Sequence, residues 1–479
     1  MDAEIDNVRA AWSRAAKSSQ VDRLAEGIQG LGQFCDWRAR YKEGEKSFRI
    51  VAERLAADGA AQPTEQLKVW GSALAWQARF NQRLGHTETA RERAHQSLAL
   101  LDELTLAGLD VRRERALALQ VIGEIELQLG NCQSGKEPLA QSLSLYRTLD
   151  DRRSIANCLR SAGRLAERMG DYAQATQLHQ EGVAICRELG SQRDMVDAQL
   201  DLYVDLRCIG HHQEAERLLQ ESLAICQESG DRAALTAVRY RLALDWMDSK
   251  PAESLAVLEE CVSIYADLGD RHRWALALMR FGEAHMRLGQ YNQARASLQE
   301  SLNWYQEVDN RWGIGAALRL LAQVAQVEGQ YAEAKQLFRA SAVAFRRSGA
   351  QADIGWALAG LSMAAVGLGE LDQARQNAIE ALRVALQFHN DAAPTYVLVS
   401  LALLAAKEGR GERAVELWAL ASRVPELTTS CFYQGLYRQH IEPVAATLTP
   451  ELIAEAEARG RARDEWAALE ELRNELGEC

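Results

Sequence analysis

Apolar residues along most of this chain recur at intervals of three and four, the spacing that places them on one face of an α-helix. Between positions 315 and 328 the pattern is carried by Leu318, Leu321 and Ala325. It resumes after Gly329 with Tyr331 and its successors. A glycine is common where a helix ends because it tolerates a positive φ there. The pattern therefore predicts two helices joined by a short turn at Gly329.

This helix–turn–helix pattern repeats with a nearly constant period. Small residues occupy the turn position at successive intervals of 40, 40, 39, 40, 40, 40 and 40 residues: Gly130, Gly170, Gly210, Ser249, Gly289, Gly329, Gly369 and Gly409. A fixed period in this range indicates a stack of repeated units rather than one globular core. Similar turns near 38–44 and 84–87 extend the pattern upstream, so about ten helix pairs are expected.

Two further columns of the repeat predict packing positions. The residue five after each turn position is always small, which indicates a close approach of two helices: Gly135, Ala175, Ala215, Ser254, Ala294, Ala334, Ala374 and Ala414. A second column places Cys186 and Cys226 in register with Tyr146, Tyr265, Tyr305 and Phe345. These two cysteines are therefore interpreted as core residues rather than as redox or metal-binding groups.

Polar turns separate one helix pair from the next. They contain Asp or Asn, whose side chains accept hydrogen bonds from the first amides of a helix. The turns are Asp150-Asp151, Gly230-Asp231, Gly269-Asp270, Asp309-Asn310 and His389-Asn390-Asp391.

Composition narrows the class of protein. A hydrophobic content of 47% with only 7 prolines in 479 residues suits an all-α fold. The net charge of −12 argues against nucleic acid as a direct partner. No apolar run is long enough for a membrane helix, and the acidic residues near Met1 oppose a signal peptide. The nine cysteines form no CxxC pair, so we expect a cytoplasmic protein with reduced thiols.

The turn sequences resemble the tetratricopeptide repeat. The segments 169–175 (Met-Gly-Asp-Tyr-Ala-Gln-Ala) and 288–294 (Leu-Gly-Gln-Tyr-Asn-Gln-Ala) carry this likeness. The resemblance implies an all-α, right-handed superhelical solenoid whose first helices line a concave groove. The expected organisation is N-terminal helices with an atypical first repeat at 1–63, 40-residue repeats at 64–424, and capping helices at 425–479. The cap is expected because a solenoid must cover the apolar face of its last repeat.

Motifs of catalysis are absent or explained by the repeat. Residues 130–136 match the start of a phosphate-binding loop, GxxxxGK, but a helical pattern precedes them and Glu137 follows the lysine instead of Ser or Thr. His211, His212 and His285 are not arranged with other residues as metal ligands. No nucleophile–base pattern occurs, so we expect no catalytic residue, no metal, no cofactor and no enzymatic activity.

Candidate ligand contacts lie in the first helix of each pair. The residue ten before the turn position is Arg160, Arg239 or Arg319 in three repeats, with Arg164 and Arg280 nearby. Arginine on a concave wall can bind carboxylate or phosphate groups. Pairing with neighbours such as Glu124 and Glu283 is the alternative. The column becomes apolar toward Met363 and Leu403, which would suit an acidic or amphipathic peptide.

Three tryptophans near the starts of successive first helices are also candidates. Trp274, Trp312 and Trp356 occupy different offsets and so depart from the repeat. Contact with a ligand and burial between repeats both remain open for them.

Both ends of the chain resemble the repeat arm of bacterial STAND signalling ATPases. The segments 3–12 and 37–44 are similar to the start of that arm, and 436–443, 457–461 and 467–469 to its terminal helices. The resemblance implies a sensor arm that binds an inducer (peptide, protein or small molecule) in the groove and acts on an upstream ATPase module. The alternative is a free-standing tetratricopeptide scaffold or co-chaperone that binds peptide segments.

Overall fold

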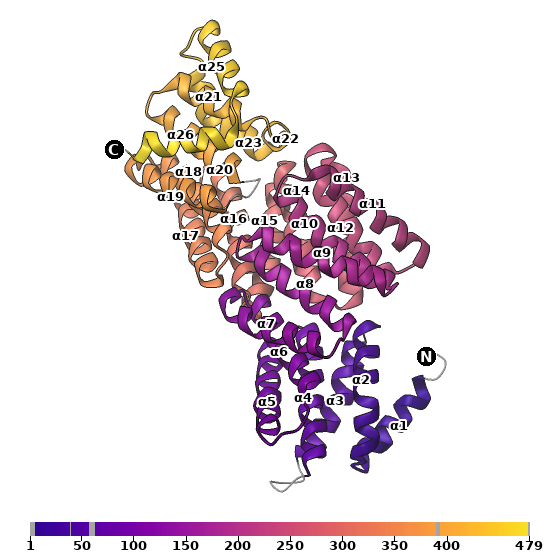
Figure 1. Cartoon of the computed structure of the whole chain (residues 1–479). Coiled ribbons are helices and arrows are strands. Elements are labelled where there is room, and N and C mark those ends of the chain that lie inside the picture. Colours follow the sequence, from indigo (N-terminus) through magenta and orange to yellow (C-terminus); the bar gives the residue numbers. More distant parts are fainter. Residues whose placement is uncertain (1–4, 39, 57–62, 389–392, 478–479) are drawn as a thin grey trace. The chain divides into compact units, whose positions relative to one another are not determined.

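The computed structural model describes residues 5–38, 40–56, 63–388 and 393–477. Within them the regular structure consists of helices alone (Figure 1). After α1 (Ile5–Lys17) come ten consecutive pairs: α2 (Val21–Trp37) and α3 (Tyr41–Ala56), α4 (Thr64–Arg83) and α5 (Thr87–Leu106), α6 (Arg112–Gln128) and α7 (Cys132–Thr148), α8 (Arg152–Arg168) and α9 (Tyr172–Glu188), α10 (Gln192–Cys208) and α11 (His212–Ser229), α12 (Arg232–Ser249) and α13 (Pro251–Leu268), α14 (Arg271–Arg287) and α15 (Tyr291–Glu307), α16 (Arg311–Val327) and α17 (Tyr331–Ser348), α18 (Gln351–Leu368) and α19 (Leu371–Phe388), α20 (Ala393–Lys407) and α21 (Gly411–Ala421). The predicted all-α, tetratricopeptide-like array is confirmed.

The periodic glycines form the turn inside each pair. All seven adopt a positive φ of 74–83°, which side chains other than glycine rarely allow. The eighth turn position, Ser249, is instead the last residue of α12, and Lys250 follows with φ −143°. The turn therefore needs glycine only where the backbone enters the left-handed region.

Three of the polar turns between pairs cap the next helix as the sequence predicts. Asp151 accepts from the Ser154 amide at 3.2 Å and Asp231 from the Ala234 amide at 3.1 Å. Asn310 accepts from the Gly313 amide at 2.7 Å. The turn expected at 389–391 lies outside the described residues.

Small residues hold the two helices of a pair together. The column five after each turn is buried throughout, as predicted. A further column, twelve after the turn, supplies serine hydroxyls that donate to a backbone carbonyl 26 residues earlier in the first helix of the same pair. These bonds are Ser97 to Gly71 at 2.7 Å, Ser142 to Ala116 at 2.7 Å, Ser301 to Ala275 at 2.9 Å and Ser341 to Gly315 at 2.7 Å.

The helix array divides into two compact units. The first consists of the described residues up to 128 with 133–162 and 269–271; the second consists of 129–132, 163–268 and the described residues from 272 onward. The predicted boundaries after 63 and 424 remain a prediction. In the first unit, α1 packs on α3, where Arg9 donates to both carboxylate oxygens of Glu43, at 2.5 and 2.7 Å. These residues belong to the two N-terminal segments that resemble the signalling ATPases, of which positions 3, 4 and 39 lie outside the described residues.

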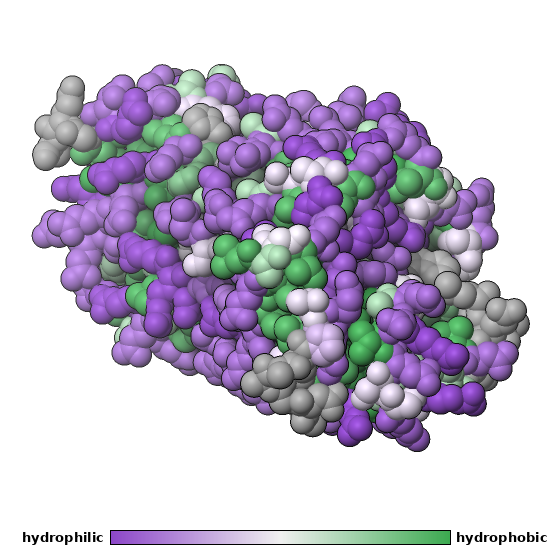
Figure 2. Space-filling view, turned by 60° about the horizontal axis from the view of Figure 1, so that its bottom comes forward, coloured by the Kyte–Doolittle hydropathy of each residue, from purple (hydrophilic) through white to green (hydrophobic). Residues whose placement is uncertain are grey.

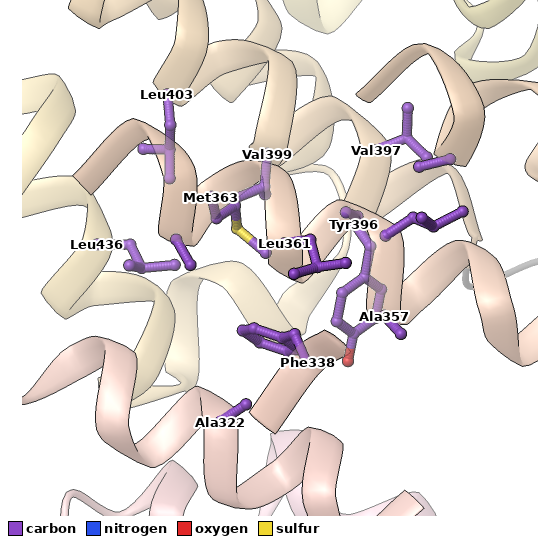
Figure 3. Packing of buried hydrophobic residues seen from close by; sticks show 14 of the residues in the cluster. Ala322, Phe338, Ala357, Leu361, Met363, Tyr396, Val397, Val399, Leu403 and Leu436 are labelled. Carbon is purple, nitrogen blue, oxygen red and sulfur yellow. The ribbon is translucent and has the colours of Figure 1, made fainter. Parts of the chain in front are cut away.

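The second unit contains an extended hydrophobic core. Figure 3 shows part of it, where Phe338, Leu361 and Tyr396 approach one another. Cys186 and Cys226 are each 1% exposed, which confirms the prediction that they are buried.

The C-terminal helices belong to the second unit and leave the pairwise pattern. They are α22 (Pro425–Thr429), α23 (Cys431–Leu436), a π-helical turn (Tyr437–Ile441), α24 (Glu442–Ala445), α25 (Pro450–Ala462) and α26 (Glu465–Gly477). As expected from Thr449-Pro450, the Thr449 hydroxyl caps α25 by accepting from the Leu452 amide. Helix α25 packs on α21, and α26 packs on α19 and α20.

The surface is mainly polar on the face that Figure 2 shows. On the face shown in Figure 2, hydrophobic residues occur in small separate groups among hydrophilic ones. Within the described part of the chain, no helix combines the length and apolar character needed to cross a bilayer.

Candidate functional site

Charged side chains gather inside the second unit, on the first helices of four pairs and on α22. We call this the ionic cluster, and it consists of Arg168, Arg280, Glu283, Arg287, Arg319, Asp353 and Glu426. The residues come from α8, α14, α16, α18 and α22. Buried charges are expensive unless they are paired, so the partners of each residue decide what the cluster can do.

Arg287 is the most extensively paired cation of the cluster. Its Nη2 lies 3.1 Å from Glu283 Oε1 and 2.9 Å from Glu426 Oε1, and its Nη1 pairs with Asp248. Burial raises the pKa of Glu283, but Arg280, Arg287 and Arg319 together lower it to about 2. Burial raises the pKa of Glu426 despite Arg287. Glu283 is therefore ionised, and it forms ion pairs with Arg280 and Arg287.

Trp312 connects α16 to two other first helices. Its indole Nε1 donates to Asp353 Oδ2 at 2.9 Å, and the Arg168 guanidinium lies 3.4 Å from its ring centroid. Burial raises the pKa of Asp353, and Arg168 acts in the opposite direction. The arrangement combines a cation–π contact with a buried hydrogen bond, so this candidate tryptophan has two structural partners.

Arg319 differs from Arg280 and Arg287 of the cluster, which form ion pairs. Its side chain is 4% exposed, and its Nη1 donates to Gln323 Oε1 at 3.2 Å. Its Cζ lies 5.2 Å from the ring centroid of Trp356 and 6.0 Å from that of Tyr396, and these two rings stack at 5.6 Å. Among the described residues, no carboxylate forms an ion pair with Arg319, and its Nε has no acceptor.

The remaining predicted site residues are placed elsewhere or paired. Arg280 Nη1 donates to Glu283 Oε2 at 2.6 Å, and Arg239 Nη1 to Glu260 Oε1 at 2.6 Å. Arg160 and Arg164 lie half-buried on α8. Trp274 packs against the hydrophobic core of the second unit.

Glu124, in the first unit, was expected as a partner of the candidate arginines. It pairs instead with Arg79, and accepts from Gln120 Nε2 at 2.8 Å and Ser161 Oγ at 2.9 Å. Carboxylate pairing is thus present at Arg280 and Arg239, whereas Arg319 has none within the described part of the chain.

The apolar part of the expected groove is not open. Met363 and Leu403 are 1% and 0% exposed and belong to the hydrophobic core. Leu436 of α23 lies in the same cluster, near Met363 and Leu403 in Figure 3. The correction has a simple cause: burying these side chains in the core is more favourable than leaving them in water.

Sequence reasoning missed Arg168, Arg287, Asp353, Tyr396 and Glu426. A signal existed for three of them. Tyr396 follows Trp356 by one repeat of 40 residues, and Arg168 and Arg287 occupy the same repeat column, two before the turn. Glu426 lies beyond the periodic region and had no such signal.

The remaining sequence motifs do not form a phosphate-binding or metal-binding site in the described part of the chain. Gly130 lies in the turn before α7, where a Cβ would come within 2.8 Å of Ser348 Cβ and 3.1 Å of the Trp312 amide nitrogen, and the segment before it is the helix α6. The phosphate-loop likeness is thus a helix turn. Over the ranges that the structure describes, His, Cys, Asp and Glu side chains form no group of three or more suited to a metal ion.

Comparisons with protein families support the repeat assignment. Residues 114–188 match the family model "Tetratricopeptide repeat". Residues 197–250 and 244–327 match that of "Anaphase-promoting complex subunit 5". A search of curated proteins finds no match. The chain thus resembles tetratricopeptide repeat proteins, whose fold serves protein interaction.

Solved structures give distant likenesses. A Rap protein complexed with Competence and Sporulation Factor is 11% identical, with 92% of this chain and 98% of that chain covered and a TM-score of 0.42. A STAND ATPase with a tetratricopeptide repeat sensor from Pyrococcus horikoshii is 14% identical, with 84% and 55% covered and a TM-score of 0.41. BtubC from P. vanneervenii is 18% identical, with 48% and 92% covered and a TM-score of 0.38. This chain spans about half of the STAND protein's length.

Proposed function

We propose that this chain is a ligand-sensing, protein-interaction arm of a STAND-type signal-transduction ATPase or transcriptional regulator. In this proposal the first helices bind an inducer, and the occupied arm changes its contact with an ATPase module. The observation that carries the proposal is Arg319, a buried arginine that neighbours two aromatic rings and lacks a carboxylate partner among the described residues. Buried arginines without an ion-paired carboxylate are rare in purely structural cores.

The resemblance of the chain ends supports the regulator class. In the first unit, Arg9 and Glu43 of the two N-terminal segments pair with each other, so the segments form one packed structure. Their likeness to the signalling ATPases therefore concerns a folded element and not two scattered motifs.

A ligand screen tests the sensor role. Thermal unfolding of the whole chain is measured with sugars, peptides, nucleotides and organic acids, and binding of each hit is then quantified by calorimetry. We expect a hit whose affinity falls at least about tenfold, equal to 1.4 kcal/mol, in a variant carrying Arg160→Glu, Arg239→Glu and Arg319→Met. Arg346→Glu on α17 is the matched control, because its exposed side chain lies on a second helix. Unchanged binding in the triple variant would contradict the proposal.

A free-standing scaffold for peptide segments is the second candidate, and the repeat array favours it equally. The natural reading frame upstream of Met1 separates the two candidates. An in-frame ATPase supports the sensor arm, and a stop codon immediately upstream supports the scaffold.

A further inference from the structure

Arg319 is the fully buried arginine of the ionic cluster that forms no ion pair with a carboxylate of the described chain; the half-buried Arg168, which lies over the Trp312 ring, forms none either. Glu283 is held by Arg280 and Arg287, Glu426 by Arg287, and Asp353 by the Trp312 indole. Each acid of the cluster thus has a bonded donor, and Glu283 and Glu426 share Arg287. Arg319 keeps one hydrogen bond, to the neutral amide of Gln323.

Unused donors accompany this charge. A guanidinium has five N–H groups in a planar fork. The Nε of Arg319 is buried without an acceptor, as are those of Arg280 and Arg287, and so is the indole Nε1 of Trp356, which neighbours Arg319. Leaving a buried donor without an acceptor costs about 1–3 kcal/mol. The Arg319 Nε and the Trp356 Nε1 are both donors, so the missing partner must supply acceptor oxygens or nitrogens.

We propose that Arg319, bordered by Trp356 and Tyr396, binds a carboxylate group of the ligand. The inference rests on the proposed sensor function and names the chemistry of the group that its site recognises. A guanidinium binds the two oxygens of a carboxylate through parallel hydrogen bonds. The aromatic rings border the guanidinium at 5.2 and 6.0 Å and offer apolar surface to the part of the ligand next to its carboxylate.

The surrounding charges favour a single negative charge over a phosphate. Glu283, Asp353 and Glu426 all interact electrostatically with Arg319. A dianion beside Arg319 would meet about twice the repulsion from these three carboxylates that a monoanion meets. A monoanionic carboxylate therefore suits these surroundings better than a dianionic phosphate does.

Two arginine variants test the site without any ligand. Arg319→Met keeps the length and apolar stem of the side chain and removes a buried charge that has no carboxylate partner in the described chain. We expect its thermal midpoint to equal or exceed that of the wild type by a few degrees. Arg280→Met is the matched control, because it removes one of the two ion-paired partners of Glu283, and we expect a lower midpoint. A loss in Arg319→Met as large as in Arg280→Met would overturn the proposal.

Benzoate at millimolar concentration is the probe for binding, with benzamide as its neutral counterpart and inorganic phosphate as the alternative anion. We expect benzoate to raise the midpoint of the wild type more than benzamide and phosphate do, and this difference to vanish in Arg319→Met. Equal effects of benzoate and benzamide, a larger effect of phosphate, or an unchanged benzoate effect in the variant would refute the carboxylate site. A ligand from the screen that binds wild type and Arg319→Met equally would refute the site and leave the sensor role intact.

Discussion

The carboxylate of Glu426 lies 2.9 Å from the guanidinium of Arg287, and this ion pair joins the segment after the last helix pair to α14. The two residues are 139 positions apart in the sequence. Tyr433 of the same segment packs edge-on against Tyr396, with ring centroids 6.2 Å apart. Residues 425–441 are thus part of the packing around the ionic cluster and not only a cover for the last repeat.

Replacing Arg287 should destabilise the protein strongly. Arg287→Met leaves Glu283, Glu426 and Asp248 without their shared cation, and breaking a buried pair in this way costs about 3–5 kcal/mol. Glu426→Gln, in contrast, retains the shape and one oxygen of the side chain and should cost less. Denaturant unfolding of both variants measures the difference. Equal stability of Arg287→Met and wild type would show that the ion pairs contribute nothing.

The pH dependence of stability should carry a contribution from Glu124. Burial raises its pKa, but Arg79 and Arg83 lower it from 4.5 to about 2. A lowered carboxyl pKa gives stability that is complete above pH 4.5 and is lost as the pH falls toward 2. The contribution is on the order of 3 kcal/mol. Unfolding free energies measured across this range should fall less steeply for Glu124→Gln; identical slopes would contradict the assignment.

Two helix glycines should respond oppositely to the same substitution. A Cβ at Gly360 would overlap the ring of Phe338, so Gly360→Ala should destabilise by about 1–3 kcal/mol. Gly30 lies exposed in α2 with nothing within 4 Å of an added Cβ. Gly30→Ala should therefore stabilise by about 0.5–1 kcal/mol. Thermal or denaturant unfolding of the two variants provides the comparison, and effects of the same sign would reject the packing at Gly360.

The serine column should contribute one hydrogen bond per repeat. Ser341 is fully buried and donates to the Gly315 carbonyl, so Ser341→Ala should cost about 0.5–1.5 kcal/mol. Ser341→Val should cost more, because it also adds volume where α16 and α17 approach closely. Position 381, one repeat later, is a buried alanine, which has no hydroxyl to donate such a hydrogen bond. Ala381→Ser, which offers a matched hydroxyl there, should change stability less than Ser341→Val does.

The period of 40 residues determined the helix pairs, their turns and the buried small-residue columns. It could do so because each unit repeats the same local contacts. Residues at the same position of successive repeats therefore pack in equivalent places. The positive φ at Gly289 and the helix cap at Asn310 follow from local backbone chemistry and needed no knowledge of distant residues.

Only the tertiary structure decided which charged side chains form ion pairs. Arg239, Arg280 and Arg319 look alike in the sequence, yet two meet carboxylates and the third meets aromatic rings. Their surroundings depend on residues one or more repeats away and on α22, where Glu426 follows no period. The sequence likewise suggested Met363 and Leu403 as residues that line the groove. In the structure they are buried in the hydrophobic core, together with Leu436 of α23. Pairing and burial depend on distances between elements, which a one-dimensional pattern does not contain.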